Sequence, residues 1–342
     1  MTRHQPTDAL RLSIAEATEL GTRALERIGY AADEAQAICV HLVDAACCGY
    51  HFAGLPRILE IADSPRTKEP RQPIRVERET PVSMLVDGGN HIGYYAAYKA
   101  ALMAIEKAKQ SGIALVGAYN CALSGRNAYY LDLVARENLV GMLFSSAWPV
   151  VAPEGGARPM LGTNPLALAL PTEHGPFIFD MGTAAIMRGE LALRSRLDEE
   201  LPEGVAIDEH GLPTRDPHQA QKGSILPFGG LDRHKGYGLS LMIQALGLLA
   251  GASIPRGRVQ DYAHLFVVFR PDLLVPEAQF KRDVSELIRL IKATPRRPGV
   301  DEIRIPSERA FRERERARVE GILVDRKVYE ALQRMGVGLG GA

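Results

Sequence analysis

The chain has 342 residues, which suits two or three domains that share a sizeable core. Its 41 Lys and Arg residues balance its 41 Asp and Glu residues, so no strong overall field attracts nucleic acid or an anionic membrane. A hydrophobic fraction of 46% and a charged fraction of 24% are typical of a globular protein and exclude a disordered chain. This balance favours an enzyme whose partner is a small-molecule substrate, with no nucleic acid and no membrane.

The two features that indicate a cellular compartment are the N-terminus and the cysteines. The first six residues lack the apolar core of a signal peptide, and the most apolar stretch, 236–252, is too short and too interrupted to span a membrane. The four cysteines have neither the spacing of metal ligands nor that of a secreted disulfide framework. We therefore expect a cytoplasmic protein with reduced, buried thiols and no metal site.

The chain begins with a predicted helical module, residues 1–64. The sequence Ser13-Ile14-Ala15-Glu16 has the form of a capping box, which predicts a helix from there to about Ile28. A second helix is expected over Asp33–Cys48, because apolar residues recur on one face and Gly49 follows as a stop signal.

The next segment has the order of a βαβ unit. Residues 65–81 are rich in Pro and Arg and predict an extended linker, followed by a strand at 82–86, a helix to about Ser111 and a strand at 113–117. The glycines after the first strand have the spacing G-G-x-x-x-G, and the G-x-G-x-G-G run at 336–341 ends the chain without a following helix. A standard Rossmann dinucleotide site is therefore not expected.

The remaining sequence alternates short apolar runs with turns. The expected strands of this part, typical of a sheet with ligand-binding loops, are Leu139–Phe144, Leu166–Leu170, Phe177–Phe179 and His264–Phe269. A buried helix is expected to begin near Lys235, and the C-terminal part is helical and highly charged.

Seven short segments occur in a characteristic order along nearly the whole chain. They are Gly162-Thr163-Asn164-Pro165, Asp180-Met181-Gly182-Thr183, Pro202-Glu203-Gly204, the run from Asp208 to Pro217, Pro227 to Gly230, His234 to Gly238, and Ile303 to Arg309. Taken together, they resemble the malate/L-lactate dehydrogenase-like family, which includes ureidoglycolate and sulfolactate dehydrogenases and a reductase of cyclic imino acids.

The resemblance implies an α/β, non-Rossmann dehydrogenase fold with a helical N-terminal module and a mixed, largely antiparallel sheet in the nicotinamide domain. On this basis residues 65–112 form a substrate-side and dimerisation domain, 113–255 the nicotinamide-binding domain, and 256–342 a strand plus C-terminal helices returning to the substrate side. It also implies a homodimer and a nicotinamide cofactor. The sequence leaves open whether that cofactor is NAD or NADP.

The same resemblance assigns the residues that contact the cofactor and the substrate. The cofactor-binding residues carried over are Ser145, Asp180, Met181, Gly182, Thr183, His234, Lys235, Ser307, Glu308 and Arg309. A Gly/Thr/Ser loop offers N–H groups and hydroxyls to phosphate oxygens, and the basic residues offer cationic donors. Arg57, Thr163 and Asn164 are expected to bind the substrate.

The chain departs from the family at both positions of the family's histidines. The family's G-x-x-S-H-G-x-x-R pattern aligns without gaps to Gly49–Arg57, which places Ala53 at the position of the histidine. A local gap would bring His51 into that role instead, so His51 remains a catalytic candidate. The second family histidine corresponds to Leu123.

These replacements bear on the chemistry. Reduction of a ketone creates an alkoxide, and a positioned acid that protonates it contributes about 10²–10⁴ in rate. An iminium substrate already carries its proton, so the sequence favours reduction of a cyclic imino acid over that of a 2-oxo acid. Arg57 suits either substrate as a clamp for the carboxylate. Tyr50, Ser124, Tyr129 and water stay open as proton donors, and a family member that binds ligands without turnover is the alternative.

Overall fold

The computed structural model describes residues 8–256 and 259–337. The first six residues and most of the glycine-rich run at 336–341, both used in the sequence interpretation, lie outside the described residues. The strands are β1 (Ala9–Leu12), β2 (Arg75–Thr80), β3 (Ser83–Asp87), β4 (Ile113–Tyr119), β5 (Val140–Ser146), β6 (Leu166–Thr172), β7 (Gly175–Met181), β8 (Ala206–Ile207), β9 (Ser224–Ile225), β10 (Ala263–Phe269) and β11 (Ile322–Asp325). The α-helices are α1 (Ile14–Ile28), α2 (Ala32–Cys47), α3 (Pro56–Asp63), α4 (Gly93–Ser111), α5 (Asn127–Arg136), α6 (Arg188–Leu197), α7 (Pro217–Lys222), α8 (Arg233–Leu249), α9 (Glu277–Ala293), α10 (Glu308–Glu320) and α11 (Arg326–Val337).

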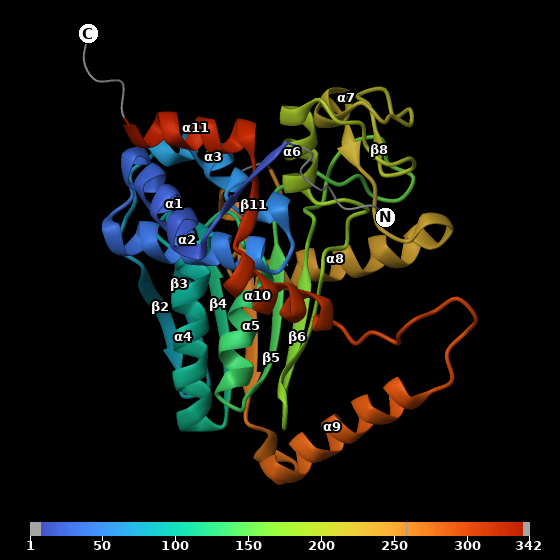
Figure 1. The fold of residues 1–342 in the computed structure, drawn as a ribbon. Helices are drawn as coiled ribbons and strands as arrows, with labels where there is room; N and C mark the ends of the chain where they lie inside the picture. Colours follow the sequence, from blue (N-terminus) through green and yellow to red (C-terminus); the bar gives the residue numbers. More distant parts are fainter. Residues whose placement is uncertain (1–7, 257–258, 338–342) are drawn as a thin grey trace.

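The centre of the protein is a seven-stranded sheet with the order β2-β3-β4-β10-β5-β6-β7 (Figure 1). Only β3 and β4 run parallel, and α4 forms the crossover between them, as the βαβ pattern predicts. All other neighbouring strands of this sheet are antiparallel. The expected α/β fold with a mixed, largely antiparallel sheet is therefore confirmed.

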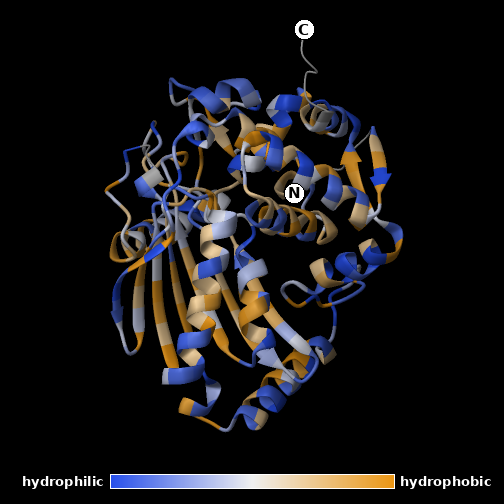
Figure 2. Ribbon diagram, turned by 90° about the vertical axis from the view of Figure 1, so that its left-hand side faces the viewer, coloured by the Kyte–Doolittle hydropathy of each residue, from blue (hydrophilic) through white to orange (hydrophobic). Residues whose placement is uncertain are grey.

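The two faces of this sheet are covered unequally. Helices α4 and α5 lie along one face, where Val116, Phe266 and Ile178 belong to a fully buried apolar core. On the other face a smaller cluster forms around Ala250 and Leu265, where the end of α8 meets β5 and β10. Figure 2 shows the hydrophobic residues concentrated along the strands and on the inner sides of the helices. The sheet edge at the ends of β4, β5 and β7 is left to form the site.

A helical module lies above that edge. The Ser13 side chain accepts a hydrogen bond from the Glu16 N–H and Glu16 caps Ser13 in return, which confirms the predicted capping box at the start of α1. Helices α1, α2 and α3 share one core with α11, and β1 pairs antiparallel with β11. The two ends of the described chain thus close a single module, and a small lobe of α6, α7, β8 and β9 stands beside it.

Two expectations about local structure were wrong. The segment expected to be an extended linker contains a short 3-10 helix, Pro65–Lys68, and the edge strand β2, whose side chains are nearly all exposed. Its sequence has no buried apolar face, so periodicity did not reveal it. Helix α8 begins close to where it was predicted, but it is buried on one side only. Ile243 and Gln244 are buried, whereas Leu241, Met242 and Leu249 are exposed.

Other expectations hold, and the sheet joins segments that the sequence divided. All four cysteines are free and buried, as predicted. No helix within residues 8–256 and 259–337 is long and apolar enough to cross a membrane. Strands from the segments 65–112, 113–255 and 256–342 all belong to the one central sheet.

Candidate active site

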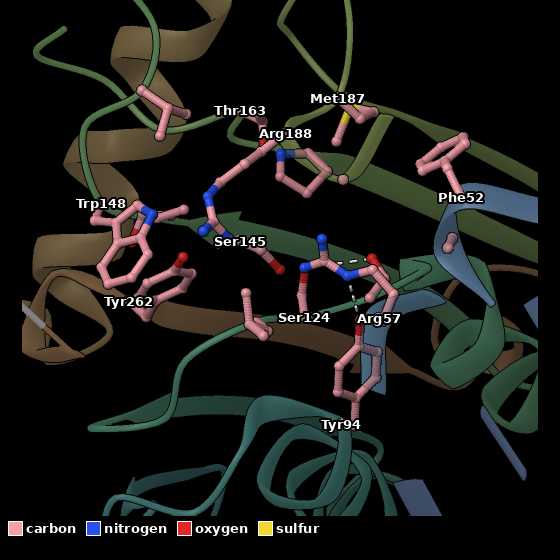
Figure 3. A pocket seen from close by; sticks show the side chains of 18 residues that line it. Phe52, Arg57, Tyr94, Ser124, Ser145, Trp148, Thr163, Met187, Arg188 and Tyr262 are labelled. Carbon is pink, nitrogen blue, oxygen red and sulfur yellow. Dashed lines mark hydrogen bonds between the residues drawn. The ribbon is translucent and has the colours of Figure 1, made fainter. Parts of the chain in front are cut away.

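A cavity of about 650 Å³, including its open mouth, lies between the helical module and the upper edge of the sheet. We call it the Arg57 cavity. Figure 3 shows that the side chains of Arg57 and Arg188 both reach into it. Its other lining residues are Phe52, Ala53, Tyr94, Leu123, Ser124, Gly125, Ser145, Ser146, Ala147, Trp148, Val150, Thr163, Pro165, Met187, Gly189 and Tyr262.

Arg57 is held rigidly at the start of α3, where Pro56 occupies the first turn. Its Nε donates to the hydroxyl of Tyr94 at 3.3 Å, and its Nη1 is paired with the carboxylate of Glu60. Burial alone would lower the pKa of Arg57, but the neighbouring Glu60 raises it above its ordinary value. The guanidinium therefore stays charged, and within the described chain its Nη2 donates no hydrogen bond to protein, so this group is available to a carboxylate.

Ala53 and Leu123, which the sequence interpretation aligns with the family's histidines, both line the Arg57 cavity. His51 lies elsewhere, in a separate small cavity with Ala46 and Ile322. Among the described residues that line the Arg57 cavity there is no His, Asp, Glu, Lys or Cys. The hydroxyl groups are the remaining proton donors, and burial raises the pKa of Tyr262 to about 12, which makes it a poor acid at neutral pH.

Ser145 enters this cavity from the end of β5. Its hydroxyl lies 3.0 Å from Nδ1 of His264 on β10 and accepts from the side-chain amide of Asn127 at 3.2 Å. Burial lowers the pKa of His264 to about 4, so the imidazole is neutral at physiological pH. The Ser145 hydroxyl also donates to the side-chain oxygen of Asn127 at 3.4 Å, so Asn127 and His264 together hold it at the cavity wall.

The predicted cofactor loop at the end of β7 is built into the scaffold. The Asp180 carboxylate accepts from the Ala128 N–H at 2.7 Å at the beginning of α5, and burial raises the pKa of Asp180. The Thr183 hydroxyl donates to the carbonyl of Thr163 at 3.1 Å. Gly182 packs so closely that a Cβ there would lie 2.4 Å from the sulfur of Met187. Met181, which precedes it, is the last residue of β7.

This loop connects the cavity with the N-terminus of α8. Thr163 and Met187 line the cavity, and the carbonyl of Thr183 accepts from the N–H of Phe228 at 3.0 Å. Phe228 is followed by Gly229 and Gly230 and then by α8, whose first turn carries His234 and Lys235, both exposed. The positive end of the helix dipole and the nearby lysine both favour an anion at this place, which fits a dinucleotide phosphate. The Lys235 amino group rests 3.2 Å from Asp232.

The other predicted residues are distributed differently. Thr163 lines the cavity, whereas the buried side chain of Asn164 donates to Gln244 at 2.9 Å and accepts from the Ala147 N–H at 3.2 Å. Asn164 therefore shapes the cavity wall from behind.

The segment Ser307-Glu308-Arg309 lies at the start of α10, outside the cavity lining. Glu308 pairs with Lys292, and the guanidinium of Arg309 stacks 5.2 Å from the ring centre of Tyr50. Ser307 adopts a left-handed conformation, φ 63°, immediately before the helix. The structure thus brings Arg57, Ser145 and Thr163 together, and it leaves this segment in a different place.

Sequence reasoning missed four residues that line the cavity: Tyr94, Trp148, Arg188 and Tyr262. It also missed His264, whose Nδ1 lies 3.0 Å from the Ser145 hydroxyl. Trp148 is the only tryptophan of the chain, and the rings of Trp148 and Tyr262 meet edge to face at 5.5 Å. The single tryptophan beside a Gly/Pro-rich segment was the one available signal, since aromatic residues in loops are enriched at binding sites.

Residues 12–333 match the family described as malate/L-lactate dehydrogenase. The chain belongs to this family. It is 33% identical to the malate/(S)-sulfolactate dehydrogenase of Methanothermus fervidus, over 94% of this chain and 96% of that one. It is 34% identical to the Delta(1)-pyrroline-2-carboxylate reductase of Ancylobacter novellus, over 96% and 98% respectively. The solved malate dehydrogenase of Pyrococcus horikoshii OT3 superposes with a TM-score of 0.87 at 31% identity, covering 100% of this chain and 99% of that one.

Membership of the malate/L-lactate dehydrogenase family confirms the resemblance on which the sequence interpretation depended. The protein is therefore an oxidoreductase, and the named relatives include both dehydrogenases of hydroxy acids and a reductase of a cyclic imino acid. The cavity of this chain combines a buried cation with a lining that, among the described residues, contains no His, Asp, Glu, Lys or Cys.

Proposed function

We propose that the protein reduces the C=N bond of a small, carboxylate-bearing cyclic imino acid, with NADH or NADPH as reductant. The observation that carries this proposal is the composition of the Arg57 cavity, where Ala53 and Leu123 replace the family's histidines beside a charged arginine. A relative that is 34% identical bears the name of a cyclic imino acid reductase, which supports the same chemistry.

The residues of the cavity have separate tasks in this proposal. A bound reduced nicotinamide supplies the hydride. Arg57 binds the substrate carboxylate through its Nη2 group and so fixes the position of the adjacent C=N carbon. Ala53 and Leu123 exclude water from that carbon. Because an iminium nitrogen already carries its proton, the electron pair of the C=N bond moves onto nitrogen without a protein acid, and the product is an amine.

The cofactor in this proposal lies along the path from the cavity to α8. The loop Asp180–Ala184 and the exposed pair His234 and Lys235 flank this path, and Ser145 lies at its cavity end. These residues fit a dinucleotide because the path combines closely packed glycine backbone with a helix N-terminus and a cation. For Ser307, Glu308 and Arg309, the support is the family motif alone.

A direct assay tests the proposed activity. The purified protein is incubated with NADH or NADPH and one of four substrates, Δ1-pyrroline-2-carboxylate, Δ1-piperideine-2-carboxylate, pyruvate or oxaloacetate, while the absorbance of reduced nicotinamide is followed. We expect the cyclic imines to be reduced faster than the ketones, with a rate that falls at high pH as the iminium deprotonates. Efficient reduction of the 2-oxo acids, with no reduction of the imines, would contradict the imine proposal.

The same samples test the alternative of a family member without turnover. A titration that follows the fluorescence of reduced nicotinamide measures binding independently of chemistry. If reduced nicotinamide binds but none of the four substrates is turned over, the result favours a family member that binds ligands without catalysis.

We propose in addition that the protein is a homodimer in which α8 and α9 contribute to the interface. Exposed apolar side chains support this arrangement, namely Leu241, Met242, Leu248 and Leu249 on α8 and Leu287, Leu290 and Ile291 on α9. Such a concentration of exposed apolar residues marks a contact surface. Light scattering at micromolar concentration should give the mass of a dimer, and Met242→Asp should shift it towards the monomer. A monomeric parent protein would contradict the proposal.

A further inference from the structure

Arg57 by itself does not present two parallel donors to the carboxylate of a substrate. Its Nε donates to the Tyr94 hydroxyl at 3.3 Å and its Nη1 is paired with Glu60, so Nη2 is the group left for a ligand. A carboxylate is held in a fixed orientation when each of its two oxygens accepts a hydrogen bond. A second donor is therefore needed from a group beside Arg57.

Tyr94, at the beginning of α4, lies where that donor is needed. It is buried and lines the Arg57 cavity, and Figure 3 shows its hydroxyl pointing at the guanidinium. Its oxygen accepts from Arg57, and within residues 8–256 and 259–337 its own O–H donates to no protein group. This O–H is therefore available to a ligand in the cavity.

Two serine hydroxyls of the same cavity are engaged within the protein. Ser145 donates to the side-chain oxygen of Asn127 at 3.4 Å, and Ser146 donates to the carbonyl of Asp261 at 3.3 Å. Tyr94 differs from both, because its recorded hydrogen bond uses only a lone pair of the oxygen.

The shape of a guanidinium decides where an acceptor on Nη2 lies. Nε and Nη2 occupy one edge of the planar group, and their N–H bonds on that edge are parallel. The Tyr94 oxygen occupies the Nε position of this edge, so an oxygen bound to Nη2 lies directly beside it. The Tyr94 O–H can then donate to the same carboxylate that Nη2 binds.

The ring of Tyr94 is fixed from behind. His41 meets it edge to face, with the ring centres 4.9 Å apart, and the Nε2 of His41 accepts from the Arg126 N–H at 3.0 Å. Burial lowers the pKa of His41 well below its ordinary value, so this imidazole is neutral. Gly125 packs so closely that a Cβ there would lie 2.3 Å from Cε1 of Tyr94. The hydroxyl is thus pre-organised, which reduces the entropy lost on binding.

We infer that Tyr94 and the Nη2 group of Arg57 hold the substrate carboxylate together, with the Tyr94 O–H as donor of the second hydrogen bond. This inference rests on the proposed function, in which Arg57 binds the carboxylate beside the C=N bond. Arg57 also polarises the phenol, because donation from Nε to the phenol oxygen strengthens the O–H as a donor. Tyr94 would distinguish a carboxylate from a carboxamide, since the amide presents N–H donors in place of the second acceptor.

Binding of substrate analogues tests Tyr94 without depending on turnover. Pyridine-2-carboxylate and pyridine-2-carboxamide are titrated by calorimetry into the parent protein and into Tyr94→Phe, each saturated with NADH or NADPH. Tyr94→Phe should weaken the carboxylate about tenfold, the loss of one hydrogen bond to a charged group, and leave the carboxamide within about threefold. In steady-state kinetics with Δ1-piperideine-2-carboxylate, the variant should raise KM by a similar factor and change kcat less.

Two further variants assign this effect to the hydroxyl of Tyr94. Tyr129→Phe is the matched control, because the Tyr129 ring also packs against His41, at 4.4 Å between centres, but is not part of the described cavity lining. Its affinities should equal those of the parent. In an Arg57→Met background, Tyr94→Phe should still weaken the carboxylate about threefold or more, because the contact is direct. Circular dichroism and a thermal melt confirm that each variant is folded.

Three results would overturn the inference: no loss or an equal loss of both ligands in Tyr94→Phe, no further loss in the Arg57→Met background, or a fall in kcat at unchanged KM. The second result would make Tyr94 a positioning residue for Arg57, and the third would make it the proton donor. Failure of the proposed function gives a different pattern, because a ketone reductase or a family member without turnover still loses the preference for the carboxylate in Tyr94→Phe.

Discussion

Two clusters of buried arginines in this protein are built differently. Arg126 and Arg314 face Asp44 and Asp132, with a contact of 2.7 Å for Arg126 and contacts of 3.0 Å from Arg314 to each aspartate. Arg57 and Arg188 share the carboxylate of Glu60, and the Nη1 of Arg66 is buried without a hydrogen-bond partner. The first cluster is balanced within the protein and joins α2, α5 and α10. The second has an unpaired buried donor beside a cavity, which is the arrangement expected where a ligand completes the site.

The largest expected effect comes from adding an imidazole to the Arg57 cavity, whose described lining has no histidine. Ala53→His should raise any trace reduction of 2-oxo acids, by up to about 10²–10⁴, since that is the contribution of a well-placed general acid. Reduction of cyclic imines should change little. Steady-state kinetics on both substrate classes measures the two effects, with Ala53→Gln as a control for side-chain volume. A similar response of both classes would contradict the proposed division of chemistry.

Removing the Arg57 guanidinium should lower activity on every substrate. Arg57→Met is expected to lower kcat/KM about 100-fold on imines and ketones alike, because both classes carry the carboxylate that Arg57 clamps. Arg57→Lys should recover only part of this loss, because an ammonium group lacks the planar pair of donors. Unchanged kinetics in Arg57→Met would remove Arg57 from the site.

A substitution in the cluster of Arg126, Arg314, Asp44 and Asp132 should lower stability and leave activity nearly unchanged. Arg314→Met leaves Asp44 and Asp132 partly uncompensated in a buried position and should lower the free energy of unfolding by about 3 kcal/mol. The kcat/KM of the folded variant should stay within about twofold of the parent. Urea unfolding and kinetics on the same preparation provide both numbers. Lost activity at full stability would show that this cluster is part of the site as well.

The smallest effect is expected at an exposed charge outside both clusters. Lys235 lies in the first turn of α8, and Lys235→Ala should weaken binding of reduced nicotinamide about tenfold, which corresponds to about 1.4 kcal/mol. Fluorescence titration measures the dissociation constant, and Lys222→Ala on α7 serves as a control for general charge. An unchanged constant in Lys235→Ala would separate α8 from the cofactor path.

The family and most secondary structure followed from local signals in the sequence. The capping box at Ser13 fixed the start of α1, and the apolar runs fixed β4, β5 and β10, because both signals depend on neighbouring residues only. The edge strand β2 was missed because a strand with no buried face has no apolar periodicity. The sequence predicted that α8 is buried because the segment is rich in apolar residues. Several of these residues are exposed, and composition alone does not distinguish buried from exposed apolar residues.

The sequence by itself predicted that Arg57 belongs to a site and, through the family resemblance, that Ala53 and Leu123 stand at two histidine positions. Only the tertiary structure decided that both replacements line the cavity of Arg57, and that His51 does not. It also decided which guanidinium groups share a ring, since Arg66 and Arg188 are 122 positions apart and both lie over Trp148. Charge balance is a property of distances in space, whereas the sequence records only order along the chain.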